Sequence, residues 1–309
     1  MNFIKPQFWD KNKITFYSIL LLPVSLFIKL LFLLKKYTTK SHAFSIPIIC
    51  VGNIYLGGTG KTPFSIELYS ILKNLNMKPA FVRKKYKSFQ DEIDLLKQSG
   101  PIYQSNKRIG AIKDSINNNT NIVILDDGFQ DFSIKKKLSI ICFNEKQWIG
   151  NGLTIPSGPL RESLSALKRA NFVVINGKKN IDIENKIFSE NNKIKIFYFE
   201  YKPQNIKQFE GKNVTAFAGI GNPENFFDLL KANKINVINT IKFSDHHKYT
   251  EKELENLIND VKKNNNILLT TEKDYFRISE RYKQNIQCLK IKIEIENKKK
   301  LIEEIKKII

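Results

Sequence analysis

The sequence predicts an α/β protein: a mainly parallel sheet flanked by helices, a second smaller α/β lobe, and an N-terminal membrane helix. Three observations predict this fold. Short apolar runs alternate with segments of helical spacing up to about residue 208, which is typical of a parallel sheet covered by helices. A new set of such patterns starts near Gly211, and the chain begins with one long apolar stretch. We therefore expect three parts, at 1–40, 41–208 and 209–309.

Short apolar runs bounded by turn signals are the expected strands. In the larger domain they are 46–51, 79–83, 121–126, 138–143, 171–175 and 194–199. In the smaller lobe the strands are 214–218, 237–243, 267–270 and 286–295, with helices at 224–232 and 251–262. A glycine turn at Gly219 and Gly221 follows the first of these strands, and it lacks the rest of a nucleotide-binding fingerprint.

A glycine-rich turn connects the first expected strand to a helix. Its residues are Gly57, Gly58, Thr59, Gly60, Lys61 and Thr62. In a phosphate-binding loop, glycines let backbone N–H groups turn toward phosphate oxygens, the lysine reaches the outer phosphates and the threonine hydroxyl binds Mg²⁺. The sequence therefore predicts a P-loop NTPase-like sheet that binds ATP. The strict pattern requires glycine where Tyr55 stands, so the alternative is a plain glycine-rich turn.

The net charge of +21 predicts attraction to a polyanion, such as an anionic membrane surface or a phosphorylated substrate. No nucleic-acid motif and no arginine-rich stripe accompany the charge, so we expect no nucleic-acid partner. Cys50, Cys142 and Cys288 are unclustered and lie in apolar runs. Such cysteines are typical of buried thiols in a reducing compartment.

The stretch from Ile14 to Leu34 is almost wholly apolar. About 20 helical residues cross the ~30 Å core of a bilayer, and lysines (Lys11, Lys13, Lys35 and Lys36) flank this stretch on both sides. The flanks leave the orientation undecided. Pro23 and Lys29 also suit a helix that lies in the membrane interface, and a buried core helix is a further alternative.

Two acidic pairs follow expected strands. Asp126 and Asp127 end the strand at 121–126, where a carboxylate of a phosphate-loop protein holds Mg²⁺; an Asp-Gly turn is the alternative. Asp91 and Glu92 lie in an expected loop after the second strand, and taken alone they read as a solvated acidic pair.

Two further motifs combine charge with a rigid turn. His246 follows Asp245, and a histidine oriented by a carboxylate can act as, or support, a general base. Arg161 and Glu162 end a Pro-Ser-Gly-Pro turn that begins at Pro156, and the arginine is suited to binding a phosphate. The alternative for the turn is an ordinary helix N-terminus at the surface.

The order of these motifs resembles the tetraacyldisaccharide 4'-kinases, the lipid A 4'-kinases of Gram-negative bacteria. The resemblance runs from the apolar helix to about residue 276 and includes the tyrosine in place of the first loop glycine. Its motifs are Val51–Asn53, Gly57–Pro63, Leu125–Gln130, Gly150–Gly152, Pro156–Glu162, Ala218–Pro223, Asp245–His247 and Thr271–Asp274.

The resemblance implies roles for residues of the larger domain. Lys61 acts in catalysis and binds the ATP phosphates together with the loop glycines and Thr59. Thr62, Asp126, Asp127 and Glu162 hold Mg²⁺. Gln130 and Arg161 bind the nucleotide.

The resemblance also implies a base and its helper. Asp91 takes the proton of the acceptor hydroxyl, Glu92 faces the metal, and His246 supports Asp91 from across the cleft. The implied substrate is a membrane-embedded acylated disaccharide 1-phosphate, phosphorylated at its 4'-hydroxyl to give lipid IVA. Residues 14–34 anchor the chain at the cytoplasmic face of the bacterial inner membrane beside anionic lipid, without an obligate protein partner.

Two rival interpretations use the same motifs. A membrane-tethered nucleotide switch hydrolyses ATP slowly and acts through protein partners. An inactive paralogue binds anionic lipid without transferring phosphate. The switch predicts ATPase activity that lipid A precursors do not change, and it predicts no role for Glu162 or His246.

Overall fold

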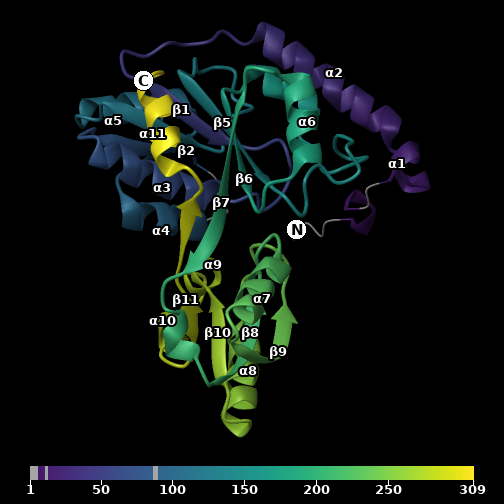
Figure 1. Cartoon of the computed structure of the whole chain (residues 1–309), viewed down its shortest axis with the longest axis vertical. Helices are drawn as coiled ribbons and strands as arrows, with labels where there is room; N and C mark the ends of the chain where they lie inside the picture. Colours follow the sequence, from purple (N-terminus) through teal and green to yellow (C-terminus); the bar gives the residue numbers. More distant parts are fainter. Residues whose placement is uncertain (1–5, 11–12, 86–89) are drawn as a thin grey trace. The chain divides into compact units, whose positions relative to one another are not determined.

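The computed structural model describes residues 6–10, 13–85 and 90–309, so Lys11 lies outside the described residues. The chain forms two compact units (Figure 1). Of the described residues, the larger unit contains 6–10, 13–85, 96–200 and 294–309. The smaller unit contains 90–95 and 201–293.

The larger sheet has eight strands among the described residues, in the order β12-β7-β6-β5-β1-β4-β2-β3. The seven strands from β7 to β3 all pair in parallel. The strands are β1 (Ile48–Gly52), β2 (Pro79–Lys84), β3 (Ile102–Ser105), β4 (Ile122–Asp126), β5 (Leu138–Asn144), β6 (Phe172–Asn176), β7 (Lys195–Pro203) and β12 (Ile291–Ile295). The predicted parallel α/β sheet is confirmed.

The strand order reverses at β1. The chain moves from β1 to β2, β3 and then β4 on one side, and continues to β5 on the other side of β1. In open α/β sheets, ligands bind at the carboxyl ends of strands where the order reverses. The loop after β1 and the acidic turn after β4 both lie at this point.

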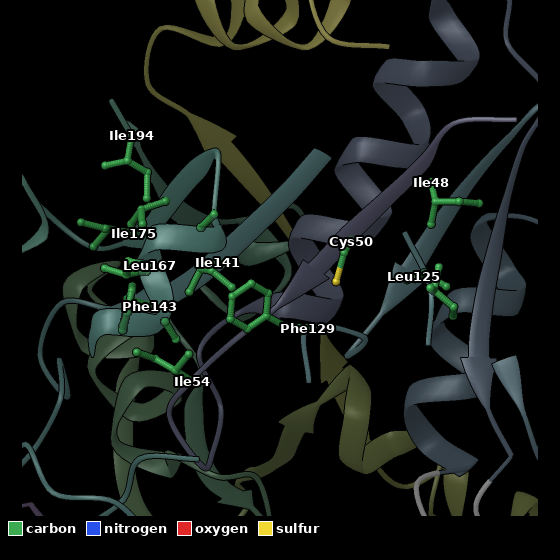
Figure 2. Packing of buried hydrophobic residues seen from close by; sticks show 14 of the residues in the cluster. Ile48, Cys50, Ile54, Leu125, Phe129, Ile141, Phe143, Leu167, Ile175 and Ile194 are labelled. Atoms are coloured by element: carbon green, nitrogen blue, oxygen red, sulfur yellow. The ribbon is translucent and has the colours of Figure 1, made fainter. Parts of the chain in front are cut away.

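Helices and short 3₁₀ segments cover the larger sheet. They are α3 (Lys61–Asn74), α4 (Gln90–Ser99), α5 (Arg108–Asn117), η2 (Leu164–Arg169), α6 (Ile181–Glu190) and α11 (Lys298–Lys306). The strands read as continuous apolar runs because both faces of the sheet are buried. Figure 2 shows part of the resulting core, where Cys50, Leu125, Phe129 and Ile141 pack together.

The apolar N-terminal segment does not form the single membrane helix that we predicted. After η1 (Gln7–Trp9) it forms α1 (Phe16–Leu20) and α2 (Leu22–Thr38), and the break comes at Leu21 just before Pro23. Proline fits the first turn of a helix but not a helix interior. No helix in the part of the chain that the structure describes is long and apolar enough to cross a membrane.

The smaller unit has its own four-stranded parallel sheet among the described residues, ordered β11-β10-β8-β9. Its strands are β8 (Asn213–Ala218), β9 (Asn236–Lys242), β10 (Ile267–Thr271) and β11 (Gln287–Leu289). Its other elements are η3 (Ile206–Phe209), α7 (Pro223–Ala232), α8 (Glu251–Lys263), α9 (Glu272–Tyr275) and α10 (Glu280–Lys283). Buried aromatic and aliphatic side chains fill the space on either side of this sheet.

Three local predictions differ from the structure. The run 286–295 is two strands in different sheets, β11 and β12, which separate at Lys290. Strand β3 was not predicted because its four residues are only partly buried. Asp91 and Glu92 lie in the first turn of α4 rather than in a loop.

The compact units and the predicted domain ranges assign two segments differently. Residues 90–95 group with the smaller unit and 294–309 with the larger one. The position of a segment along the chain does not show which unit it joins, because this depends on long-range contacts such as strand pairing.

Candidate active site

The glycine-rich loop connects β1 to the start of α3 in the larger unit. Gly57 and Gly60 adopt positive φ angles of 141° and 86°, which glycine accepts far more readily than other residues. Gly60 precedes the first turn of α3, so Lys61 and Thr62 begin that helix. A helix N-terminus behind a glycine turn favours bound anions.

Two fully buried residues, Asn53 and Tyr55, fix the conformation of the loop. The Asn53 amide donates to Tyr55 O at 2.6 Å and to Thr59 Oγ1 at 3.1 Å. The Tyr55 ring is fully buried, and its hydroxyl donates to Asp10 Oδ1 at 2.9 Å. Tyr55 also pairs with Leu160 in an antiparallel bridge, so it joins the loop to the Pro-Ser-Gly-Pro turn.

Asp127, which directly follows β4, pairs with two cationic side chains. Arg161 Nη1 donates to Asp127 Oδ1 at 2.7 Å, and Lys61 Nζ lies 3.8 Å from the same oxygen. Burial alone would raise the pKa of Asp127, but Lys61 and Arg161 outweigh it and lower the pKa to about 2. The carboxylate is therefore charged at neutral pH, and the two cations converge on it beside the glycine-rich loop.

Asp126 is almost fully buried beside it. Ser65 Oγ donates to its Oδ1 at 3.2 Å, and Arg83 Nη1 lies 3.3 Å from its Oδ2. The two neighbouring aspartates thus face different partners, because successive side chains at a strand end point to opposite sides.

Glu162 and Gln130 link the turn to the strand end. Arg169 donates to both oxygens of Glu162, at 3.0 and 2.7 Å. The Gln130 amide donates to Glu162 Oε1 at 3.1 Å and to Asn53 O at 3.0 Å. Gln130 thereby ties the loop, the acidic turn and Glu162 into one frame.

Asp91 and His246 contact each other within the smaller unit. Asp91 lies in the first turn of α4, and His246 follows β9. His246 Nδ1 is 3.3 Å from Asp91 Oδ1. The prediction that His246 supports Asp91 from across a cleft needs correction in this respect, because both residues belong to the same compact unit.

Two cations complete this cluster. Arg277 donates from Nη2 and Nε to Asp91 Oδ2 at 2.6 and 3.2 Å. Lys273 Nζ lies 3.1 Å from Glu92 Oε1 and 3.6 Å from Asp91 Oδ2. Burial would raise the pKa of Asp91, but the bond to His246 and the charges of Lys273 and Arg277 hold it well below the usual range.

Comparison with known proteins decides the family. A sequence profile described as "Tetraacyldisaccharide-1-P 4'-kinase" matches residues 17–92 and 83–309. The chain belongs to this family. The match includes the glycine-rich loop, the Asp126-Asp127 pair and the smaller unit with His246.

Named relatives agree over nearly the whole length. The chain is 40% identical to the tetraacyldisaccharide 4'-kinase of Pelagibacter ubique, covering 97% of this chain and 96% of that one. It is 33% identical to the protein of the same name from Rickettsia akari, with the same coverage.

A solved structure shares the fold. The LpxK protein of Aquifex aeolicus, crystallised in complex with ATP, aligns over 94% of this chain and 99% of its own with a TM-score of 0.72. The two sequences are 24% identical in that alignment.

The sequence motifs predicted no role for several residues that the structure places beside the predicted ones, although two of these, Asn53 and Lys273, lie within the motifs. They are Asn53, Ser65, Arg83, Arg169, Lys273 and Arg277. A charged residue at the end of an otherwise apolar run is the signal that marks Arg83. Arg277 carries no comparable signal, because it lies in a polar turn 186 residues from Asp91.

Proposed function

We propose that this chain transfers the γ-phosphoryl group of ATP to the 4'-hydroxyl of an acylated glucosamine disaccharide 1-phosphate, giving lipid IVA. Membership of the 4'-kinase family supports this function. The observation that carries it in the structure is the convergence of Lys61 and Arg161 on Asp127 behind a glycine-rich loop. This arrangement concentrates positive charge where the charge of a transferring phosphoryl group develops.

Phosphoryl transfer also needs an acceptor for the hydroxyl proton. As the new P–O bond forms and the bond to ADP breaks, the 4'-hydroxyl loses its proton. Asp91 is ionised and so can accept a proton, and its Oδ1 is hydrogen-bonded to His246; we assign it as the acceptor. The His246 imidazole then stabilises the protonated Asp91 carboxyl group through the hydrogen bond between them.

The donor atoms at the loop fit Mg²⁺. Thr62, Asp126, Asp127 and Glu162 offer only oxygen ligands, which Mg²⁺ prefers. Among residues 6–10, 13–85 and 90–309, no group of three or more His, Cys, Asp or Glu side chains is arranged to hold a metal by itself. In the proposed reaction these oxygen-bearing residues would hold Mg²⁺, which would neutralise charge on the ATP phosphates.

Lysine and arginine partners already occupy the carboxylates. Asp127 pairs with Lys61 and Arg161, and Glu162 pairs with Arg169. In the proposed ATP complex, Lys61 and Arg161 would pair with the phosphates, and Asp127 would then help to hold Mg²⁺. We therefore assign both sets of residues to one nucleotide site.

The N-terminal helices support an association with the membrane surface. The polar side chains Ser18 and Ser25 are buried against the larger unit, whereas Phe16, Leu26 and Leu30 are more than half exposed. An apolar face turned outward and flanked by lysines suits the boundary between lipid headgroups and acyl chains. We propose that residues 14–34 hold the protein on the cytoplasmic face of the inner membrane, beside anionic lipid and its lipid substrate.

A direct assay tests the kinase activity. Purified protein is incubated with labelled ATP, Mg²⁺ and the tetraacyl disaccharide 1-phosphate in mixed micelles. We expect a 4'-phosphorylated product, and we expect Asp91→Ala to reduce its rate by about 10²–10⁴-fold, the usual contribution of a general base. Asp94→Ala, on the same helix but bonded to Gln90, is the matched control and keeps the wild-type rate.

The assay also separates the rival functions. A nucleotide switch hydrolyses ATP at a rate that the disaccharide does not change, and an inactive paralogue yields no product from either reaction. If folded protein binds ATP but forms no labelled lipid, this result contradicts the proposal.

A further inference from the structure

Arg277 binds Asp91 and a backbone carbonyl that His246 also binds, although it belongs to none of the motifs that predicted the Asp91–His246 pair. It lies in the turn after α9, with 10% of its side chain exposed. Nη2 and Nε both donate to Asp91 Oδ2, at 2.6 and 3.2 Å. The other carboxylate oxygen, Oδ1, is the atom that faces His246 Nδ1. The guanidinium therefore takes one oxygen and leaves the other to the imidazole.

The third nitrogen of Arg277 binds a backbone carbonyl that also accepts a hydrogen bond from His246. Nη1 donates to Gly219 O at 2.6 Å, and the backbone N–H of His246 donates to the same carbonyl at 3.1 Å. His246 needs this support because its φ of 58° lies in the left-handed region, which costs energy for a residue other than glycine. Arg277 thus binds both the Asp91 carboxylate and the Gly219 carbonyl that accepts from the His246 N–H.

A buried carboxylate fixes Arg277 itself. Asp274 has no exposed surface and accepts from Arg277 Nη1 at 3.0 Å and from Gly219 N at 3.1 Å. Tyr249 and Thr271 donate to Asp274 as well, at 2.8 and 2.7 Å. The planar fork of arginine loses little freedom in such a frame, and it can serve three acceptors at once.

Lys273 lies in the same cluster but its geometry differs. Its Nζ is 3.6 Å from Asp91 Oδ2, 3.1 Å from Glu92 and 3.3 Å from His246 Nε2. A lysine ammonium is a point charge that adjusts to its neighbours. Lys273 adds positive charge to the cluster, whereas the planar guanidinium of Arg277 fixes the orientation of the Asp91 carboxylate through directed hydrogen bonds.

We propose that Arg277 is a positioning residue for the transfer: it holds Asp91 Oδ2 and the Gly219 carbonyl, and so keeps Asp91 Oδ1 and His246 in their mutual geometry. The inference rests on the proposed function, since it concerns the base of that reaction. Misplacing a reacting group by about 1 Å can cost ~100-fold in rate without loss of substrate binding.

The kinetic test compares Arg277→Gln and Arg277→Lys with Arg281→Gln. Arg281 lies in the same unit and pairs with Glu251, so it controls for the loss of an ion-paired arginine. We expect Arg277→Gln to lower kcat by about 100-fold while the KM for ATP changes less than about threefold, because the loss concerns orientation rather than uniform binding. Arg277→Lys recovers part of kcat, and Arg281→Gln keeps it.

Coupling to Asp91 distinguishes positioning from a general structural effect. If Arg277 acts through Asp91, Arg277→Gln has little further effect in an Asp91→Asn background. Equal effects in both backgrounds, or a kcat within twofold of wild type for Arg277→Gln, would overturn the proposal. If Arg277→Gln does not fold, the rate of Arg277→Lys decides: a wild-type kcat without the fork overturns it.

A spectroscopic readout does not depend on activity. The chain has three histidines, so the imidazole nitrogen resonances of His246 can be assigned by single His→Gln variants. We expect Arg277→Lys to shift the His246 signals and to leave those of His42 and His247 in place. If wild type shows no transfer but this shift appears, the proposed function fails and the positioning contact stands. If the His246 signals are unchanged, the positioning contact fails whatever the activity.

Discussion

Two residues of the candidate site adopt backbone conformations that are uncommon outside glycine. Asp127 and His246 have φ angles of 55° and 58°. Asp and His tolerate the left-handed region better than branched residues do, and specific bonds hold each of them there. Asp127 N donates to Val51 O at 2.9 Å, and His246 N donates to Gly219 O at 3.1 Å. Both uncommon backbone conformations thus occur at residues whose side chains pair with charged groups.

Removing the loop lysine tests the phosphate site. We expect Lys61→Ala to reduce phosphate transfer by about 10²–10³-fold, because it removes a cation from the place where transition-state charge develops. Labelled-product assays at saturating ATP measure the loss. Lys73→Ala, exposed near the end of the same helix, should transfer at the wild-type rate. Equal losses in both variants would assign the effect to net charge rather than to the site.

The acid stability of the larger unit depends on Asp127. Its pKa of about 2 in the folded chain lies below the unfolded value near 4, so ionised Asp127 stabilises the fold above about pH 4. This contribution is lost as the pH falls from about 4 toward 2. Arg161→Gln removes one cause of the lowered pKa, so its urea midpoint should fall less between pH 5 and pH 3 than that of wild type. A larger fall in the variant would contradict this assignment.

Three elements that are distant in sequence meet around the loop after β1. Tyr55 and Leu160 form a bridge, Leu56 N donates to Pro159 O at 2.8 Å, and Arg161 N donates to Ile54 O at 2.7 Å. Helix α2 reaches the same turn, because Ser25 Oγ contacts Ser157 Oγ at 2.8 Å and Thr154 O at 3.0 Å. The apolar helix is therefore tied to the turn that ends in Arg161.

Matched variants of α2 separate docking from lipid contact. Ser25→Ala leaves buried partners unsatisfied, and we expect it to cost about 1–3 kcal/mol of unfolding free energy while vesicle binding by folded protein persists. Leu26→Asp changes a side chain that is 63% exposed, so we expect little loss of stability but weaker vesicle binding. Denaturation by urea and co-sedimentation with vesicles measure the two effects. The reverse pattern would show that the exposed face of α2 does not meet lipid.

At the scale of the whole molecule, the chemistry is divided between two compact units. The larger one carries the phosphate loop, Asp127 and Arg161, and the smaller one carries Asp91 and His246. The family match covers both units.

The charge of the whole chain predicts salt-dependent membrane association. With a net charge of +21, we expect binding to vesicles that contain anionic lipid to weaken steeply as salt rises to about 0.5 M, because surface charges are then screened. Vesicles of neutral lipid are the control and should bind more weakly, with little change in salt. Binding to anionic vesicles that salt leaves unchanged would assign the association to the apolar helix alone.

Local patterns predicted much of this molecule. The strands that carry the site, the start of α3 at Lys61 and the acidic turn after β4 follow from apolar runs and glycine turns. The break in the N-terminal helix was missed, although Pro23 marks its place. The split of 286–295 between two sheets was also missed, since periodicity shows a strand but not its partner.

The sequence by itself determined the α/β class, the phosphate loop and the family, because these depend on local spacing and on motif order. The tertiary structure decided what Tyr55 contacts, which cations face each aspartate, and that Arg277 binds Asp91, 186 residues away in the sequence. The physical reason is that the packing of elements distant in sequence determines which side chains meet, and buried polar groups need hydrogen-bond partners. The local spacing of residues does not show which distant side chains these partners are.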